Sequence, residues 1–277
     1  MANTKISALP AGAPAQATDL LPIDRAGSNF SLQVFDILNN ALAYPNLSAA
    51  GIVGASYDRI FVSGSVNGDN PIYTVPSGMR AMVLVSFYNT NGGTATVIPE
   101  VNPGTGTYYR LAANLTPGTN AGVTSVYGTF VFEANDVIAY NCNVTGVNAF
   151  GVVLLFSNTS KLRTVRKFAT TWVTGAQTIY TATGQNVVVA GLLMGASNSI
   201  YVNQSGSAAT IAAYVVQSGN TPAAGNQFQS NNNATVANNG TSGPFGEGTL
   251  LKAGDFIAFA TNQTGQQALL FNVYEGV

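Results

Sequence analysis

The residue types that could carry out chemistry are scarce in this chain. It has no histidine, one cysteine (Cys142) and eleven acidic residues. The absence of histidine removes the commonest general base, proton shuttle and metal ligand. A single thiol can form neither an intrachain disulfide nor a thiolate zinc site. Cys142 lies on an expected strand, where a small buried thiol is the simplest interpretation.

The acidic residues are scattered along the sequence. Cleavage of a glycosidic bond needs two carboxyl groups that face each other across the bond, and here only the fold could bring such a pair together. Asp58, Asp69 and Glu100 are candidates, but no spacing singles them out. We therefore predict a protein that is not an enzyme, with no catalytic residue, no metal site and no cofactor.

Two segments of the sequence are repeated. Residues 133–140 (EANDVIAY) return as residues 252–259 (KAGDFIAF), and upstream Arg59-x-Phe61 returns as Arg166-x-Phe168. A duplicated β unit behind a different N-terminal segment favours an assembly component built from repeated modules over a catalyst.

The repeat contains an aspartate in each copy, Asp136 and Asp255. Each follows a residue that accepts positive φ, Asn135 or Gly254, and each opens a strand of alternating apolar residues. We predict a tight structural turn in which the aspartate side chain accepts backbone N–H groups.

Short apolar segments separated by turn signals follow one another from residue 57 to residue 156, and the second copy repeats this pattern. Regular short strands with Pro and Gly turns are typical of antiparallel sandwiches. We predict an all-β fold with two tandem antiparallel β-sandwiches of jelly-roll type, at residues 46–158 and 166–277.

Two polar segments interrupt this pattern. Residues 218–246, rich in Asn, Gly and Ser, lack hydrophobic periodicity and are expected to form an exposed loop on the second sandwich. Residues 159–165 are expected to be a basic linker, because the stretch 161–167 holds four of the ten basic residues. This stretch is either a solvated linker or a docking strip for an acidic neighbouring subunit.

Residues 1–45 form a different kind of segment, an anchoring arm followed by a short helix. The prolines at 10, 14 and 22 favour extended backbone. Isolated hydrophobic residues on an extended strip cannot form a core, so this strip is either a disordered tail or an arm on another surface. The expected anchors are Ile6, Leu9, Leu20, Leu21 and Ile23.

A helix is expected from about Ser31 to Ala43, because apolar residues there follow the i, i+3, i+4, i+7 spacing. Its stripe would pack either on the following domain or on symmetry-related copies. The stripe consists of Val34, Ile37, Leu38 and Leu42.

Charged residues make up 8% of the chain, against about 25% in typical soluble proteins. Neutral amides and hydroxyls must then cover the surface, and burial in an oligomer is favoured. The net charge of −1 gives no electrostatic case for nucleic acid or an anionic membrane. No apolar run reaches the length of a membrane span, and the N-terminus lacks the apolar segment of a secretory signal, so synthesis in the cytoplasm is expected.

Tyrosines near amides would suit sugar binding by stacking and hydrogen bonding, although tyrosine on a strand is more often a packing residue. The residues concerned are Tyr108, Tyr109, Tyr201, Asn203 and Gln204.

The segments 5–10 (KISALP) and 18–24 (TDLLPID) resemble the N-terminal signature of tailed-bacteriophage virion proteins, including decoration proteins, head fibres and tail fibres. The resemblance implies an arm bound to the capsid or tail, with the variable part projecting outward. The Ala-Asn/Gly-Asp turn also looks like that of trimeric jelly-roll modules in phage appendages and in the C1q and tumour-necrosis-factor-like families.

The resemblance implies a virion protein that is assembled in the host cytoplasm. We expect a capsid decoration or head-fibre protein that forms a homotrimer. Its partner would be the major capsid protein or another virion protein. The alternative is a tail appendage that binds host glycans through the second sandwich. A polysaccharide-degrading spike is a third, less favoured class.

Overall fold

The computed structural model describes residues 20–25, 28–33, 55–124, 127, 130–183, 187–189, 199–222, 227–243 and 250–275. Within these ranges all the named elements are β-strands, and all the strand pairs are antiparallel. The all-β prediction is therefore confirmed. The chain divides into two compact units, residues 1–47 and 48–277. No helix long and apolar enough to cross a membrane occurs among the described residues.

The first unit contains a hairpin. Strand β1 (Leu20–Arg25) pairs with β2 (Ser28–Gln33), from Leu20 opposite Gln33 to Arg25 opposite Ser28. The backbone of β1 is extended, as predicted for the arm, but it is paired with a neighbouring strand. The side chains of the expected anchors Leu20, Leu21 and Ile23 are not described, and Ile6 and Leu9 lie outside the described residues.

The predicted helix from Ser31 to Ala43 is wrong at its start. Residues 31–33 belong to β2, where Phe30 and Leu32 alternate with polar neighbours, and this period of two favours a strand. The rest of the expected helix, including Val34, Ile37, Leu38 and Leu42, lies outside the described residues.

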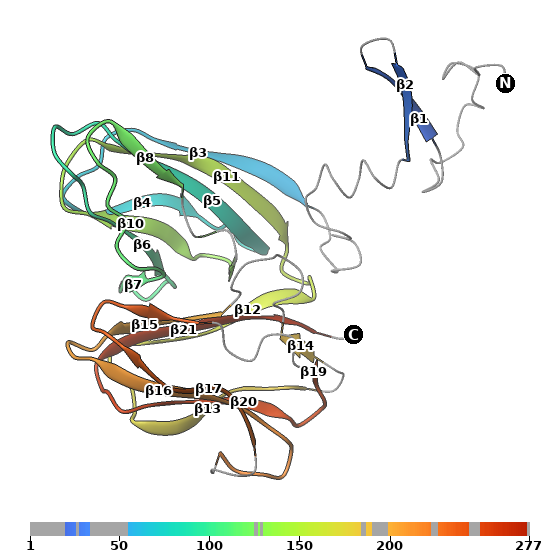
Figure 1. Cartoon of the computed structure of the whole chain (residues 1–277), viewed down its shortest axis with the longest axis vertical. Coiled ribbons are helices and arrows are strands. Elements are labelled where there is room, and N and C mark those ends of the chain that lie inside the picture. The colour runs from blue at the N-terminus through green and yellow to red at the C-terminus, as the bar shows by residue number, and fades with distance from the viewer. Residues whose placement is uncertain are drawn as a thin grey trace. The chain divides into compact units, whose positions relative to one another are not determined.

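The second unit begins with two sheets that we call the first sheet pair (Figure 1). One sheet has the strand order β4-β10-β6-β7 and the other β3-β11-β5-β8, with β9 also paired to β5. The strands are β3 (Ser56–Val62), β4 (Gly68–Thr74), β5 (Met79–Asn89), β6 (Val97–Asn102), β7 (Tyr109–Arg110), β8 (Ala121–Thr124), β9 (Val131–Phe132), β10 (Val137–Cys142) and β11 (Val147–Ser157).

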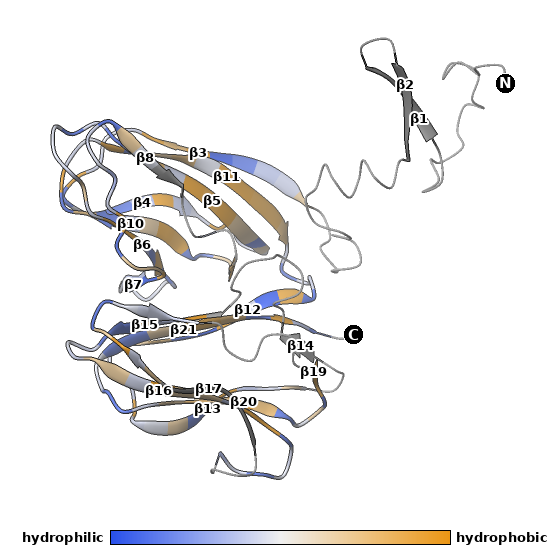
Figure 2. Ribbon diagram, in the orientation of Figure 1, coloured by the Kyte–Doolittle hydropathy of each residue, from blue (hydrophilic) through white to orange (hydrophobic). Residues whose placement is uncertain are grey.

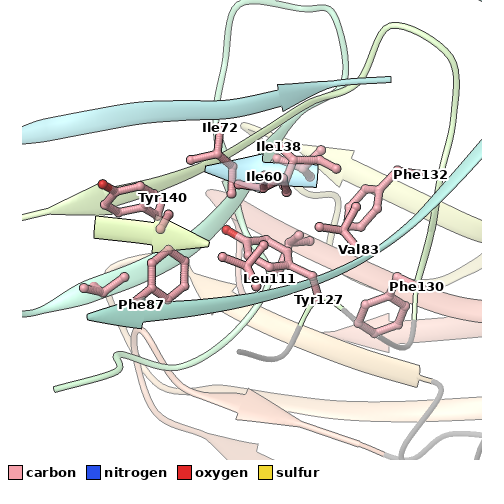
Figure 3. Close-up of a cluster of buried hydrophobic side chains, with 14 of the residues drawn as sticks. Ile60, Ile72, Val83, Phe87, Leu111, Tyr127, Phe130, Phe132, Ile138 and Tyr140 are labelled. Carbon is pink, nitrogen blue, oxygen red and sulfur yellow. The ribbon is translucent and has the colours of Figure 1, made fainter. Parts of the chain in front are cut away.

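A hydrophobic core fills the space between these sheets. Val83 and Phe87 on β5 meet Ile138 and Tyr140 on β10, as Figure 3 shows, and the rings of Phe87 and Tyr140 are 4.9 Å apart. Cys142 is fully buried in the same core. The alternation of inward apolar residues along these strands explains why they form this layer.

A second sheet pair follows. Its sheets have the orders β18-β15-β21-β14-β19, with β12 on the other side of β21, and β13-β20-β16-β17. The strands are β12 (Leu162–Ala169), β13 (Gly175–Thr181), β14 (Val187–Val189), β15 (Ser199–Gln204), β16 (Ala209–Val216), β17 (Gln227–Val236), β18 (Thr241–Ser242), β19 (Leu250–Leu251), β20 (Phe256–Thr261) and β21 (Gln266–Tyr274).

The two sheet pairs have the same strand order. We number the strands of each pair from 1 to 8 in chain order. In this numbering β8 with β9, β14 with β15, and β18 with β19 each count as one strand. In both pairs, one sheet then has the order 1-8-3-6 and the other has the order 2-7-4-5. The repeat seen in the sequence is therefore also a repeat in topology.

Two of the sequence boundaries need correction. Strand β12 starts at Leu162, so most of the expected linker 159–165 is part of a strand that pairs with β21. Strands β17 and β18 lie inside the expected loop 218–246. An edge strand can form from an Asn-rich sequence because its ladder uses backbone groups. At the end of β17, Val236 is buried in the core of the second sheet pair.

Strand β21 joins the two sheet pairs. Leu269 and Phe271 face the core of the second pair, whereas Ala268 and Leu270 face the core of the first. Hydrophobic residues lie along β21 and along the strands of both cores (Figure 2). A strand that is buried on both faces ties the two halves of this unit together.

Candidate functional site

The described residues contain no group of three or more His, Cys, Asp or Glu side chains that could hold a metal ion. The structure does bring together three sets of polar residues. These are the two aspartate turns, an arginine-lined cleft and a pair of neighbouring carboxyl groups, of which Glu100 is buried and Asp69 is exposed.

In the first aspartate turn, Asn135 has a φ of 69° and the Asp136 carboxylate folds back on the turn. Its Oδ2 accepts the Glu133 backbone N–H at 2.8 Å. The backbone of the turn also exchanges hydrogen bonds with Val75, which donates to the Asp136 carbonyl at 2.9 Å and accepts from Asn135 at 2.9 Å. The side chain thus satisfies backbone donors that a tight turn leaves open.

The second aspartate turn has the same construction. Gly254 has a φ of 87°, and Asp255 Oδ2 accepts the Lys252 N–H at 3.0 Å. Asp255 Oδ1 accepts the Ser218 N–H at 2.9 Å, and the turn exchanges hydrogen bonds with Ala182.

The surroundings of the two aspartates differ. The side chain of Asp136 is 1% exposed and forms an ion pair with Arg166 on β12, a residue of the second sheet pair. Burial raises the pKa of Asp136, and the Arg166 guanidinium acts against that rise. Asp255 is half-buried, and no ion pair within the described ranges includes it.

The basic stretch 161–167 is engaged within the chain. Arg163 pairs with Glu275 at 2.7 Å, and Lys167 donates to Gln177 and lies 4.9 Å from the centroid of the Trp172 ring. Lys161 lies 6.0 Å from the centroid of the Tyr274 ring. Intramolecular contacts therefore occupy the basic side chains of this stretch, where the sequence predicted a solvated linker or a docking strip.

A cleft of about 430 Å³ lies beside this stretch and is lined by Arg80, Arg163 and Arg166. Each of these arginines has a carboxylate partner, and Arg80 pairs with Glu133 at 2.9 Å. The charges are neutralised locally, so the arginines leave little net attraction for an anion. No nucleophile with an adjacent base lines the cleft.

The structure brings together two of the three carboxyl groups that the sequence offered as candidates. Glu100 is buried on β6, close to Asp69 and opposite Arg110 on β7. Burial is the main cause that raises the pKa of Glu100 to about 8, and the Asp69 charge adds to it. Its Oε2 has no hydrogen-bond partner. Asp58 lies elsewhere and accepts from Tyr73 at 3.1 Å.

This pair resembles a general-acid arrangement only in the raised pKa of Glu100. Glu100 is 7% exposed and lies in the ladder between β10 and β7. A carboxyl group with so little exposure is not open to a substrate, so we interpret Glu100 as a buried structural acid.

The tyrosines and amides expected for sugar binding do not form an exposed platform. Tyr109 is buried and its ring stacks on Phe168 at 4.8 Å. Tyr201 is buried and donates to Gln267 at 2.5 Å. Asn203 is buried and donates to backbone carbonyls, and Gln204 accepts the Arg110 N–H at 3.3 Å. Packing, the alternative interpretation of these residues, fits better.

The first sheet pair also has an exposed apolar face that the sequence did not predict. Phe61, Leu84, Phe150 and Val152 are all exposed there, beside Arg59. The sequence feature that could have predicted it lies in residues 147–156, where apolar residues occupy both faces of the strand. Such a pattern is typical of a strand that is covered on both faces.

No family model matches the chain, and no curated protein matches its sequence. Among solved structures, the STIV MCP is similar over 80% of this chain and 96% of its own, with 7% identity and a TM-score of 0.32. The major capsid protein P2 from bacteriophage PM2 is similar over 80% of this chain and 98% of its own, with 10% identity and a TM-score of 0.31. The PBSX exported protein XepA is similar over 99% of both chains, with 10% identity and a TM-score of 0.27. At these values we assign no role from them.

Proposed function

We propose that this chain is a non-enzymatic structural protein of a bacteriophage virion, and specifically a capsid decoration or head-fibre protein. The observation that carries the proposal is the segment 5–24, which resembles the N-terminal signature of tailed-phage virion proteins. The segment would bind the major capsid protein or another virion protein. Its apolar anchors would each contribute about 1.5–3 kcal/mol when fully buried. They are Ile6, Leu9, Leu20, Leu21 and Ile23.

The two sheet pairs would then be tandem jelly-roll modules that face outward. Their shared strand order supports this part of the proposal. Self-association, with a homotrimer as the preferred state, would present several arms at once. Several weak arms acting together give a tight attachment through multivalency.

Capsid binding by the full chain, compared with a chain that lacks residues 1–30, tests the anchor directly. We expect the full chain to sediment with empty capsids and the shortened chain to stay in solution, because the shortened chain has lost all five anchors. A chain with Val173→Ser, an exposed position on the body, serves as the matched control and should still bind. Equal binding by the shortened chain would contradict the proposal.

The same preparations separate the glycan-binding alternative. A tail appendage would bind host glycans on an array and would show no affinity for capsids. Glycan binding without capsid binding would therefore replace a decoration role by a tail role.

A further inference from the structure

The outer surface of the sheet β3-β11-β5 is apolar and open. Phe61 on β3 is 74% exposed, Phe150 on β11 is 46% exposed, and Leu84 and Val152 are also exposed. Together with Arg59 and Ser86 they line a shallow hollow, which we call the β11 face. Contiguous apolar surface of this kind usually marks an interaction site.

The strand registers relate this face to a second one. On the first sheet pair, Phe150 lies opposite Phe61 and Ser86, and Val152 lies opposite Arg59 and Leu84.

On the second sheet pair, Ala268 lies opposite Phe168 and Val202, and Leu270 lies opposite Arg166 and Ile200. The six positions correspond one to one, and we call this second set the β21 face.

The chain itself shows what covers the β21 face. Val202, Ala268 and Leu270 are fully buried against the core of the first sheet pair. Tyr109 on β7 stacks on Phe168 at 4.8 Å, and the Asp136 turn pairs with Arg166. One edge of a sheet pair, formed by β7 and the aspartate turn, thus lies against the β21 face.

The equivalent edge of the second sheet pair carries a carboxylate that forms no ion pair with the described residues. It contains β17 and the Asp255 turn, since β17 holds the place of β7 in the strand order. Asp255 is half-buried and accepts only backbone N–H groups in the described structure. Arg59 is exposed and, among the described residues, belongs to none of the ion pairs. An unpaired acid on one surface therefore matches an unpaired base on the other.

We propose that the β11 face binds the Asp255 edge of a second copy of this chain. Arg59 of one copy pairs with Asp255 of the next, and Phe61 is buried against the same edge. The contact repeats between chains the packing that already exists within each chain. It is heterologous, so it generates a ring if the rotation closes and a filament if it does not. The inference rests on the self-association in the proposed function and names the surfaces that carry it.

Substitution of the most exposed aromatic residue provides the first test. In sedimentation velocity of the full chain, we expect the parent to associate and Phe61→Asp to remain monomeric at the same concentration, because an aspartate is costly to bury at an apolar contact. Val173→Asp, an equally exposed apolar position outside the β11 face, should associate like the parent. The melting temperature of both variants checks that they remain folded.

Cross-linking between chains provides the second test and identifies the occupant. In a Cys142→Ala background, Ser86→Cys and Lys252→Cys are made in separate chains. Ser86 lines the hollow of the β11 face and its substitution keeps Arg59 and Phe61, whereas Lys252 is exposed and adjoins the Asp255 turn. We expect a short bifunctional thiol reagent to give covalent dimers when the two chains are mixed and none with either chain alone. Cross-linking of Ser86→Cys chains with each other, or no cross-link in the mixture, would overturn the proposal.

The results distinguish this inference from the proposed function. If the parent and Phe61→Asp associate equally, the β11 face is not the contact surface, and only that part of the account is overturned. A parent chain that stays monomeric would overturn the contact and the self-association together. Capsid binding through residues 1–30 is a separate measurement that none of these results affects.

Discussion

Asp136 and Asp255 occupy the same position in the repeat and make the same turn, yet within the described residues only Asp136 has an arginine partner. The difference arises because Arg166 reaches Asp136 across the contact between the sheet pairs. A buried carboxylate needs such a cation, since removal of one partner of a buried ion pair leaves an uncompensated charge.

We therefore expect Arg166→Met to lower the free energy of unfolding by about 3 kcal/mol. Arg163→Met breaks a pair whose side chains are both about one-third exposed, and it should cost less than about 1 kcal/mol. Urea denaturation of the two variants measures the difference. Equal losses would contradict a structural role for the Asp136–Arg166 pair.

Glu100 makes stability depend on pH. Its pKa is raised to about 8 in the folded chain, against about 4.5 for an ordinary glutamate. Between these values the folded state holds a proton that the unfolded state releases. The free energy of unfolding therefore falls as pH rises from about 4.5 to about 8.

Glu100→Gln keeps the shape of the side chain without its charge. We expect this variant to lose most of that pH dependence and to be more stable than the parent above the raised pKa. Thermal denaturation across the same pH range measures the effect, and Glu133→Gln, at a partly exposed acid, is the control. A Glu100→Gln variant with the same pH dependence as the parent would show that Glu100 does not hold this proton in the folded state.

At the scale of elements, the sequence predicted strands best where alternation and turn residues agree. The expected strand starts at Val137 and Phe256 coincide with β10 and β20. Strand β17 was missed because its Asn-rich residues lack an apolar pattern, and its backbone pairing leaves no mark in the sequence. The exposed face of β11 was missed because apolar residues lie on both faces of this strand, and the sequence does not say which of the two faces is covered.

The close packing of β11 on β5 can be tested at one glycine. A Cβ added at Gly151 would overlap the Leu84 carbonyl oxygen, so the two strands would have to separate. We expect Gly151→Ala to destabilise the chain by about 2 kcal/mol or more. Gly92→Ala, where a Cβ would meet nothing within 4 Å, should be nearly neutral. Denaturation curves that coincide for the two variants would contradict this register.

At the scale of the whole molecule, a chain with few charges uses several of them inside itself. Three ion pairs occur in the described structure, and two of them involve the basic stretch 161–167. The duplication explains the fold, whereas the features proposed for function lie outside the duplicated core or where the copies differ. These features are the segment 5–24, the exposed apolar β11 face and Asp255, which has no ion-pair partner among the described residues.

The central claim is that this chain is a structural component of a virion, bound to the capsid. The most direct measurement is the location of the chain on intact particles, by electron microscopy with antibody labelling of residues in the sheet pairs. The account predicts label over the capsid surface of particles formed with the full chain. It predicts no label on particles formed with a chain that lacks residues 1–30. Label confined to the tail, or absent from particles altogether, would contradict it.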